Sequence, residues 1–244
     1  MKDQPKLFVF DAPEQVARAA AERFVEYSIA GIREHGSFAV ALAGGSTPRT
    51  AYEFLGTDEF KGHVDWSSVH LFFGDERMVP PDSPESNYRM VIDSLISRVE
   101  LPLENVHRII GETTPSESAE RYEADLKQFF QSVDWPRFDL VLLGMGADGH
   151  AASLFPGSDV LKEEVKWVAA TTQPQTGQDR ITLSLPVINY AERVTFMVTG
   201  NEKAATLARV LRSEPAYEEL PAQKVRPVNG FLEWLIDRAA AAKL

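Results

Sequence analysis

Short apolar runs alternate along this chain with longer segments in which apolar residues recur at helical spacing. Most of the runs show no polar–apolar alternation and are rich in Val, Leu and Phe, which is typical of strands buried on both faces. Strands that alternate with helices predict an α/β fold, with a mainly parallel sheet and helices on both faces. The runs are Leu7–Phe10, Phe38–Ala43, Val69–Phe73, Leu140–Leu143, Trp167–Ala170, Ile181–Leu185 and Val194–Val198.

The helical segments carry start and stop signals. The first has Asp11 as a candidate N-cap, Pro13 in its first turn and Glu14 at capping-box spacing. Gly36 predicts the end of this helix. Further helices are predicted at Pro48–Leu55, Asn87–Ser97, Ser116–Gln131, Glu202–Leu211 and Phe231–Ala242.

One polar segment, Thr171–Gln178, contains both Pro and Gly and is a candidate domain boundary. It also suits a mobile loop inside one domain, which is the interpretation we favour. The chain is then a single domain of residues 1–244, a length that fits one large domain.

Composition excludes several classes of function. The chain has no cysteine, which rules out disulfides, thiolate metal sites and a cysteine nucleophile. Its net charge of −11 makes it a poor binder of nucleic acid or anionic membranes. No run approaches the about 18 apolar residues of a membrane span, and no apolar signal-peptide segment opens the chain. We therefore expect a cytoplasmic protein, whose oligomeric state the sequence leaves open.

Four unusual segments each follow directly on an apolar run. If those runs are parallel strands, all four segments leave the sheet at its carboxyl edge, where ligands bind in open α/β sheets. The segments are Ala43–Pro48, Gly74–Arg77, Gly144–His150 and Thr199–Lys203.

The first of these segments has the composition of an anion-binding turn. Gly44 and Gly45 leave their backbone N–H groups accessible. Ser46 or Thr47 suits the N-cap, with Pro48 in the first helical position. Free N–H groups at the positive end of a helix favour a phosphate. The segment lacks the Gly-Lys-Ser/Thr ending of a Walker A loop, and an ordinary strand-to-helix turn is the alternative.

The third segment places His150 in a tight loop with three glycines. A histidine at a ligand-binding edge titrates near neutral pH and suits proton transfer, so we favour a catalytic role. The alternative is a loop histidine that hydrogen-bonds the backbone. Asp148 either orients the imidazole or shapes the turn.

Cations at this edge would offset the repulsion between an acidic chain and an anionic ligand. Arg77 and Lys203 lie in the second and fourth segments, and Arg49, Arg89 and Arg180 are further candidates. For each of them taken singly, we favour a surface salt bridge over a ligand contact.

The second segment also contains two adjacent carboxylates. Asp75 and Glu76 are either paired acid–base groups or simply partners of Arg77. We count Asp75 among the substrate-binding candidates, together with Gly44.

Other catalytic motifs are missing. There is no Gly-x-Ser-x-Gly elbow and no His-Glu-x-x-His cluster, and Asp148 with His150 would give a metal only two ligands. We therefore predict neither a metal site nor a cofactor. The spacing Gly144-x-Gly146-x-x-Gly149 matches a dinucleotide fingerprint, but it comes too late in the chain for a first strand–helix turn.

Five segments together resemble a known family. They are AGGSTP (43–48), FFGDER (72–77), PESNYRM (84–90), GMGADGHAASLFP (144–156) and RITLS (180–184). In this order, and over nearly the whole chain, they are similar to the family that unites 6-phosphogluconolactonases with glucosamine-6-phosphate deaminases.

This resemblance implies a Rossmann-like α/β domain that hydrolyses 6-phospho-D-glucono-1,5-lactone to 6-phosphogluconate, the second step of the oxidative pentose phosphate pathway. It implies no cofactor and no metal, and a small-molecule sugar-phosphate lactone as the partner. It makes His150 the catalytic base. The positions at which it implies substrate or phosphate contacts are Gly45, Ser46, Thr47, Arg77, Arg180 and Lys203.

The deaminase branch differs at one position. It carries an acidic residue before a proline where this chain has Phe155 and Pro156. A phenylalanine cannot help to open a sugar ring, so this departure favours the lactonase branch. An amino-sugar-phosphate isomerase or deaminase, and a non-catalytic sugar-phosphate-binding protein, remain the alternatives.

Overall fold

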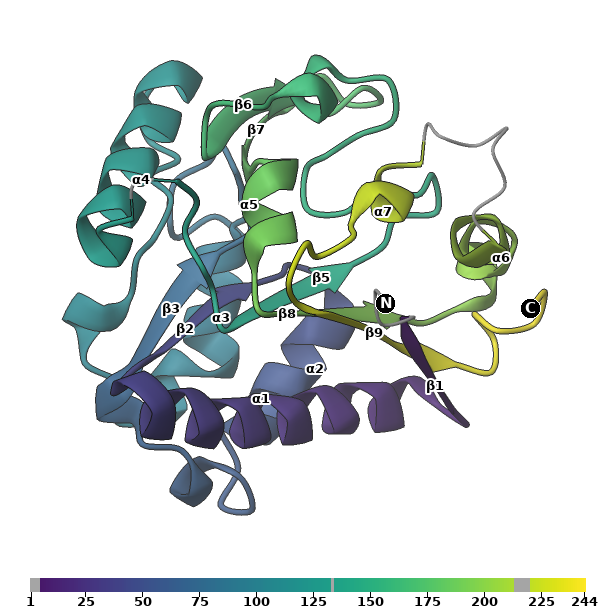
Figure 1. The fold of residues 1–244 in the computed structure, drawn as a ribbon, viewed down its shortest axis with the longest axis horizontal. Helices are drawn as coiled ribbons and strands as arrows, with labels where there is room; N and C mark the ends of the chain where they lie inside the picture. The colour runs from purple at the N-terminus through teal and green to yellow at the C-terminus, as the bar shows by residue number, and fades with distance from the viewer. Residues whose placement is uncertain (1–4, 133, 213–219) are drawn as a thin grey trace.

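The computed structural model describes residues 5–132, 134–212 and 220–244. Its main element is a six-stranded, fully parallel sheet in the order β1-β9-β8-β5-β2-β3 (Figure 1). The strands are β1 (Lys6–Phe10), β2 (Phe38–Leu42), β3 (Val69–Phe73), β5 (Leu140–Gly144), β8 (Arg193–Val198) and β9 (Phe231–Asp237). The predicted mainly parallel α/β fold is confirmed.

Helices cover both faces of this sheet: α1 and α2 lie on one side, and α5, α6 and α7 on the other (Figure 1). Their bounds are α1 (Pro13–His35), α2 (Ser46–Leu55), α3 (Asn87–Ser94), α4 (Pro115–Phe130), α5 (Leu185–Tyr190), α6 (Ala204–Arg212) and α7 (Pro221–Lys224). Short 3₁₀ helices are η1 (Lys61–His63), η2 (Trp66–Ser68), η3 (Ile96–Arg98), η4 (Leu103–Asn105), η5 (Asp159–Lys162) and η6 (Asn201–Lys203). No helix in the described ranges is long and apolar enough to cross a membrane.

A second sheet corrects part of the prediction. The runs near 167–170 and 181–185 do not join the parallel sheet but form the antiparallel strands β6 (Val168–Thr172) and β7 (Asp179–Leu183), with β4 (Asp75–Arg77) beside β7. Parallel neighbours need a connection of about a dozen or more residues, and the link between β6 and β7 is far shorter. The segment Thr171–Gln178 is therefore largely the turn of a hairpin within one sheet.

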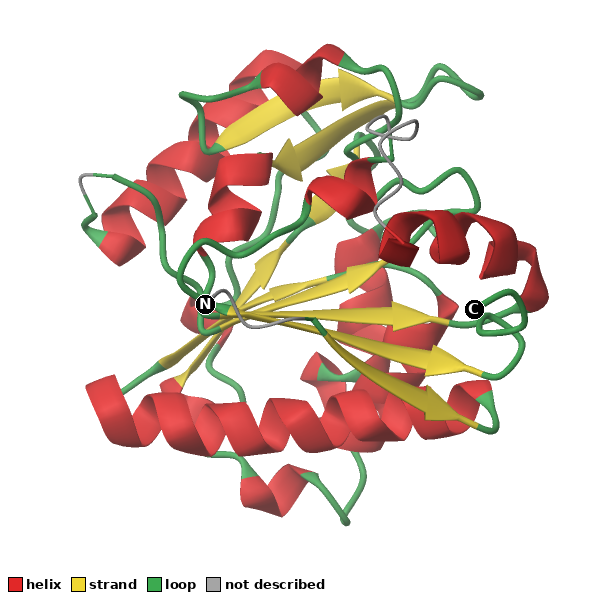
Figure 2. Cartoon of the chain, turned by 45° about the vertical axis from the view of Figure 1, so that its right-hand side comes forward, coloured by secondary structure: helices red, strands yellow, loops and turns green. Residues whose placement is uncertain are grey.

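The predicted helix Phe231–Ala242 is wrong. Residues Phe231–Asp237 form β9, which lies between β1 and β8 and hydrogen-bonds to both. Figure 2 shows the strands of the large sheet side by side, with helices above and below them. A short apolar run that is buried on two faces cannot be distinguished by periodicity from a buried helix segment. The close approach of Gly230 to the backbone of Ala191 and Glu192, where a Cβ would overlap, helps to dock this strand.

The first helix begins later than its predicted cap. Pro13 is its first residue, and the Oε1 of Gln15 accepts hydrogen bonds from the backbone N of Asp11 at 2.8 Å and of Ala12 at 3.2 Å. Gln15, rather than Glu14, thus fills the capping-box position. Gly36 ends the helix as predicted, with φ of 87°.

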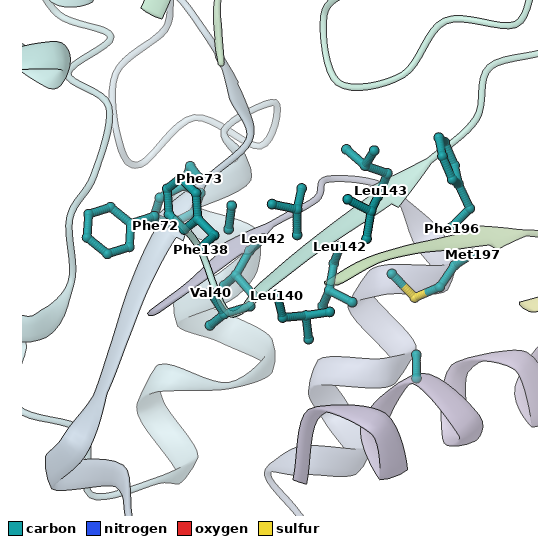
Figure 3. Close-up of a cluster of buried hydrophobic side chains, with 14 of the residues drawn as sticks. Val40, Leu42, Phe72, Phe73, Phe138, Leu140, Leu142, Leu143, Phe196 and Met197 are labelled. Atoms are coloured by element: carbon teal, nitrogen blue, oxygen red, sulfur yellow. The ribbon is translucent and has the colours of Figure 1, made fainter. Parts of the chain in front are cut away.

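The core lies where the central strands meet the helices (Figure 3). All five residues of β2 are buried, as expected for a strand between two others and under helices on both faces. Phe196 and Trp234 stack with ring centroids 3.9 Å apart across β8 and β9.

Candidate active site

Because β2, β3, β5 and β8 are parallel, the four predicted segments leave the sheet at one edge, as expected. Residues from all four line one cavity of about 330 Å³. Of the predicted site residues, the cavity lining includes Gly44, Gly45, Ser46, Thr47, Asp75, Arg77, His150 and Lys203.

Asp148 lies just behind this lining and holds His150. Its Oδ1 is 2.6 Å from His150 Nδ1 and accepts the backbone N–H of His150 at 3.2 Å. The hydrogen bond with the imidazole lowers the pKa of Asp148, so the carboxyl is ionised and acts only as an acceptor. In the neutral form of the imidazole, Nδ1 therefore carries the proton and Nε2 can accept one. Asp148 both orients the imidazole and shapes the turn.

Two neighbours complete the setting of the imidazole. A Cβ on Gly146 would overlap His150 Nδ1 and Asp148 Oδ1, so only glycine leaves room for this pair. Phe155 is buried, and its ring centroid lies 5.1 Å from that of His150.

The segment predicted to bind an anion is a strand-to-helix turn, with a shifted helix start. Helix α2 begins at Ser46, and Gly45 is its N-cap with φ of 108°, a left-handed conformation that favours glycine. Neither Ser46 nor Thr47 is the cap, and Pro48 is the third helical residue. The first N–H groups of a helix have no partner within it and carry partial positive charge, so this turn suits an anion. Thr47 Oγ1 lies 2.8 Å from Thr199 Oγ1, which ties the turn to the fourth segment.

Arg77 and Arg180 face one another across the β4–β7 pair. The Nη1 of Arg77 donates to the carbonyl of Glu85, whereas Arg77 Nε and both Nε and Nη1 of Arg180 are buried without a hydrogen-bond partner among the described residues. Burial, followed by the charge of Arg77, lowers the pKa of Arg180. Neither guanidinium group forms a salt bridge with a carboxylate of the described residues, although the charges of Asp75, Glu76 and Glu85 act on Arg180. The unpartnered donors of both groups are available to an anion, and Arg180 does not itself line the cavity.

Lys203 lines the cavity and forms no ion pair with any residue the structure describes. Of the weaker candidates, Arg89 lies 3.7 Å from Asp93 on its own helix and Arg49 is exposed. Neither lines the cavity.

Asp75 and Glu76 are not paired carboxylates, because neighbours in a strand point to opposite faces. Asp75 faces the cavity, and its Oδ2 accepts from Ser153 Oγ at 2.6 Å. Glu76 is buried, and its oxygens accept from the backbone N of Arg77, Asn87 and Tyr88 and from Ser86 Oγ. Burial raises the pKa of Glu76, and these hydrogen bonds oppose that rise. It anchors the start of α3 rather than pairing with the guanidinium of Arg77.

Sequence reasoning missed Asn87 and Ser153, which flank Asp75. Asn87 Nδ2 donates to the carbonyl of Asp75 at 2.9 Å, and its Oδ1 occupies the space that a Cβ on Gly44 would need. Both residues lie in segments that carry the family resemblance, and that was their only signal in the sequence.

A second cavity of about 340 Å³ opens beside the starts of β1, β8 and β9, and contains none of the predicted residues. The two cavities have similar volumes, so volume does not show which of them is the active site. The first cavity is the candidate because the Asp148–His150 pair, here called the dyad, and the cations without ion pairs among the described residues lie at it. Within the described ranges, no three His, Asp or Glu side chains are grouped so as to hold a metal ion.

Known proteins resemble this chain over nearly its whole length. A family model described as glucosamine-6-phosphate isomerases/6-phosphogluconolactonase matches residues 11–234. A 6-phosphogluconolactonase of Haemophilus influenzae is 36% identical, over 96% of this chain and 98% of its own length. One from Nostoc sp. is 40% identical over 87% of each chain. The structure of 6-phosphogluconolactonase from Trypanosoma cruzi is 30% identical with a TM-score of 0.88, and the match covers 100% of this chain and 98% of that one.

Proposed function

The chain belongs to the family of glucosamine-6-phosphate isomerases and 6-phosphogluconolactonases, and on that premise we propose that it hydrolyses 6-phospho-D-glucono-1,5-lactone to 6-phosphogluconate. This is the lactonase step of the oxidative pentose phosphate pathway. The observation that supports it best is one cavity that combines the Asp148-held imidazole of His150 with an anion-binding helix start and unpaired cations.

The phosphate of the substrate binds at the start of α2, to backbone N–H groups of Gly45–Thr47, and to Arg77 and Lys203. Arg180 supports Arg77 from the neighbouring strand with its unpartnered donors. Binding the phosphate fixes one end of the sugar and holds the lactone carbonyl near His150, which removes much of the entropic cost of the reaction.

His150 acts as the general base. Nε2 takes a proton from water as the water oxygen attacks the lactone carbonyl, and the ionised Asp148 stabilises the imidazolium that forms. Backbone N–H groups at the cavity edge stabilise the carbonyl oxygen as it becomes negative. The C1–ring-oxygen bond then breaks, and the imidazolium returns its proton to the leaving oxygen. The products are a free hydroxyl and a carboxylic acid, which ionises to the carboxylate by releasing its proton to water.

The buried Phe155 beside His150 supports the lactonase reaction over amino-sugar isomerisation or deamination. It occupies the place where a carboxylate would be needed for proton transfer during ring opening. We further propose a cytoplasmic enzyme whose partner is the small-molecule lactone, with neither nucleic acid nor membrane involved. The net charge of −11 supports that view.

The test is to follow disappearance of the phosphorylated lactone with purified protein against its spontaneous hydrolysis. We expect saturable acceleration and 6-phosphogluconate as the product. Ammonia release from glucosamine 6-phosphate would instead establish a deaminase. Tight binding of 6-phosphogluconate without any acceleration would establish a sugar-phosphate-binding protein.

A further inference from the structure

The loop that carries the catalytic dyad is held from outside the cavity. Thr206, on α6, donates from its Oγ1 to the carbonyl of Ala147 at 2.6 Å. On the other side of Asp148, the carbonyl of Gly149 accepts from the backbone N of Ala222 at 2.9 Å. Thr206 is only 8% exposed, so water does not readily replace its hydroxyl in this contact.

The segment that contains Thr206 also touches the anion-binding groups. Lys203 ends η6, directly before α6, and lies one helical turn ahead of Thr206. Thr199, at the start of the same segment, contacts Thr47 in the turn that opens α2. Residues 199–206 thus connect the phosphate-binding turn, a phosphate-binding cation and the loop of the catalytic base.

We propose that Thr206 is a positioning residue, which fixes the Asp148–His150 pair at a set distance from the phosphate-binding groups. The proposal rests on the lactonase function and on His150 as the base. The loop needs such a support because Gly144, Gly146 and Gly149 give its backbone little stiffness of its own. A displacement of about 1 Å at a reacting group costs up to about a hundredfold in rate.

Thr206 also contributes packing, since its Cγ2 lies close to Gly149. Two conservative variants separate packing from hydrogen bonding. Thr206→Val keeps the shape and a methyl group but removes the donor. Thr206→Ser keeps the donor but removes the methyl group.

Ser118 supplies a matched control. It is fully buried on α4, at the opposite end of the molecule from α6 (Figure 1), and donates from Oγ to the carbonyl of Ile110 at 2.6 Å. Ser118→Ala therefore removes a similar buried hydroxyl–carbonyl bond that has no contact with the cavity.

The experiment measures kcat and KM for the phosphorylated lactone, with unfolding midpoints, in the wild type and the three variants. We expect Thr206→Val to lower kcat about ten- to hundredfold with KM nearly unchanged, because the phosphate still binds while the base is misplaced. Thr206→Ser should keep most of kcat. Ser118→Ala should lower the unfolding midpoint and leave kcat unchanged.

Three results would overturn the proposal: wild-type kcat in Thr206→Val, equal losses of kcat in the Val and Ser variants, or the same loss in Ser118→Ala. If Thr206→Val does not fold, Thr206→Ala serves in its place with the same expectations. Failure of the proposed function is a separate outcome, since the wild type itself would then show no turnover.

Discussion

In the proposed mechanism, Nε2 of His150 accepts the proton from water. It can do so only while the hydrogen bond between Nδ1 and Asp148 keeps the imidazole proton on Nδ1. In Asp148→Asn the amide nitrogen can donate to Nδ1, which moves the imidazole proton to Nε2 and removes the base. We expect kcat to fall by about a thousandfold or more, as for other histidines held in the wrong tautomer. Raising the pH should not restore activity, because the tautomer and not the protonation state is changed. A kcat within a few per cent of wild type, in a folded variant, would remove Asp148 from the mechanism.

A second prediction concerns Arg77 and Lys203, which we propose bind a group remote from the reacting carbonyl. A hydrogen bond to a charged group contributes about 1.5–3 kcal/mol, so Arg77→Ala and Lys203→Ala should each lower kcat/KM for the phosphorylated lactone roughly ten- to hundredfold. Unphosphorylated gluconolactone should be affected much less, since it lacks the group that they bind. His150→Ala is the control: it should lose most of kcat on both lactones and still bind 6-phosphogluconate. Equal losses on both lactones for the two cation variants would contradict their assignment to the phosphate.

Cavity-lining residues were predictable from the sequence where they directly follow a predicted strand. His150 and Lys203 follow apolar runs within a few residues, and both line the cavity. Asn87 and Ser153 were not predictable in this way, because they reach Asp75 from 12 and 78 residues away in the sequence. Their role depends on how β4 packs against α3 and the dyad loop, which no local pattern records.

At the scale of elements, the start of α3 is anchored by a single buried carboxylate. Each oxygen of Glu76 accepts two hydrogen bonds, three of the four from backbone N–H groups. Glu76→Gln turns an NH₂ group towards N–H donors, so we expect a loss of about 1–3 kcal/mol in the free energy of unfolding. Urea unfolding measures it as a lower midpoint with an unchanged slope. Glu14→Gln, at an exposed site in the first turn of α1, should leave the midpoint nearly unchanged, and an equal shift in both variants would refute the anchor.

Helices and strands were predictable from the sequence where the apolar pattern and the length of a segment fitted only one kind of element. The strands β2, β3, β5 and β8 are short apolar runs between helix signals, and each was expected. In β9, Glu233 and Asp237 interrupt the apolar run, and the strand exists because it pairs with β1, more than 200 residues earlier in the chain. The carboxylate of Glu233 is buried in this strand, and it accepts hydrogen bonds from Tyr27, Arg23 and Thr195. These donors come together only in the folded chain.

At the scale of the whole molecule, all the groups assigned to the reaction come from the chain itself. In the proposed mechanism, His150 supplies proton transfer, and the helix start and cations supply charge stabilisation. We therefore expect full activity after exhaustive treatment with a chelator. Loss of activity that one specific divalent ion restores would replace this mechanism with metal-assisted attack.

The two sheets share one core, and this predicts how the molecule unfolds. Val168, Ile181 and Leu183 of the small sheet belong to the same buried apolar cluster as Leu140 and Phe196 of the large one. We expect a single transition in urea, in which the amides of β6–β7 and of β8–β9 lose their protection from hydrogen exchange at the same midpoint. Two midpoints would instead show two domains.

Ligand binding gives a second test of whether the two sheets unfold together. Arg77 belongs to the small sheet, whereas the dyad and Lys203 follow strands of the large one, and Arg77, His150 and Lys203 all line the cavity. A ligand held by both sheets stabilises only the state in which they are packed together, so 6-phosphogluconate should raise the midpoints of both regions equally. If it raised the midpoint of β8–β9 alone, the small sheet would neither bind the ligand nor unfold with the large one, and the assignment of Arg77 and Arg180 to the phosphate would fail with it.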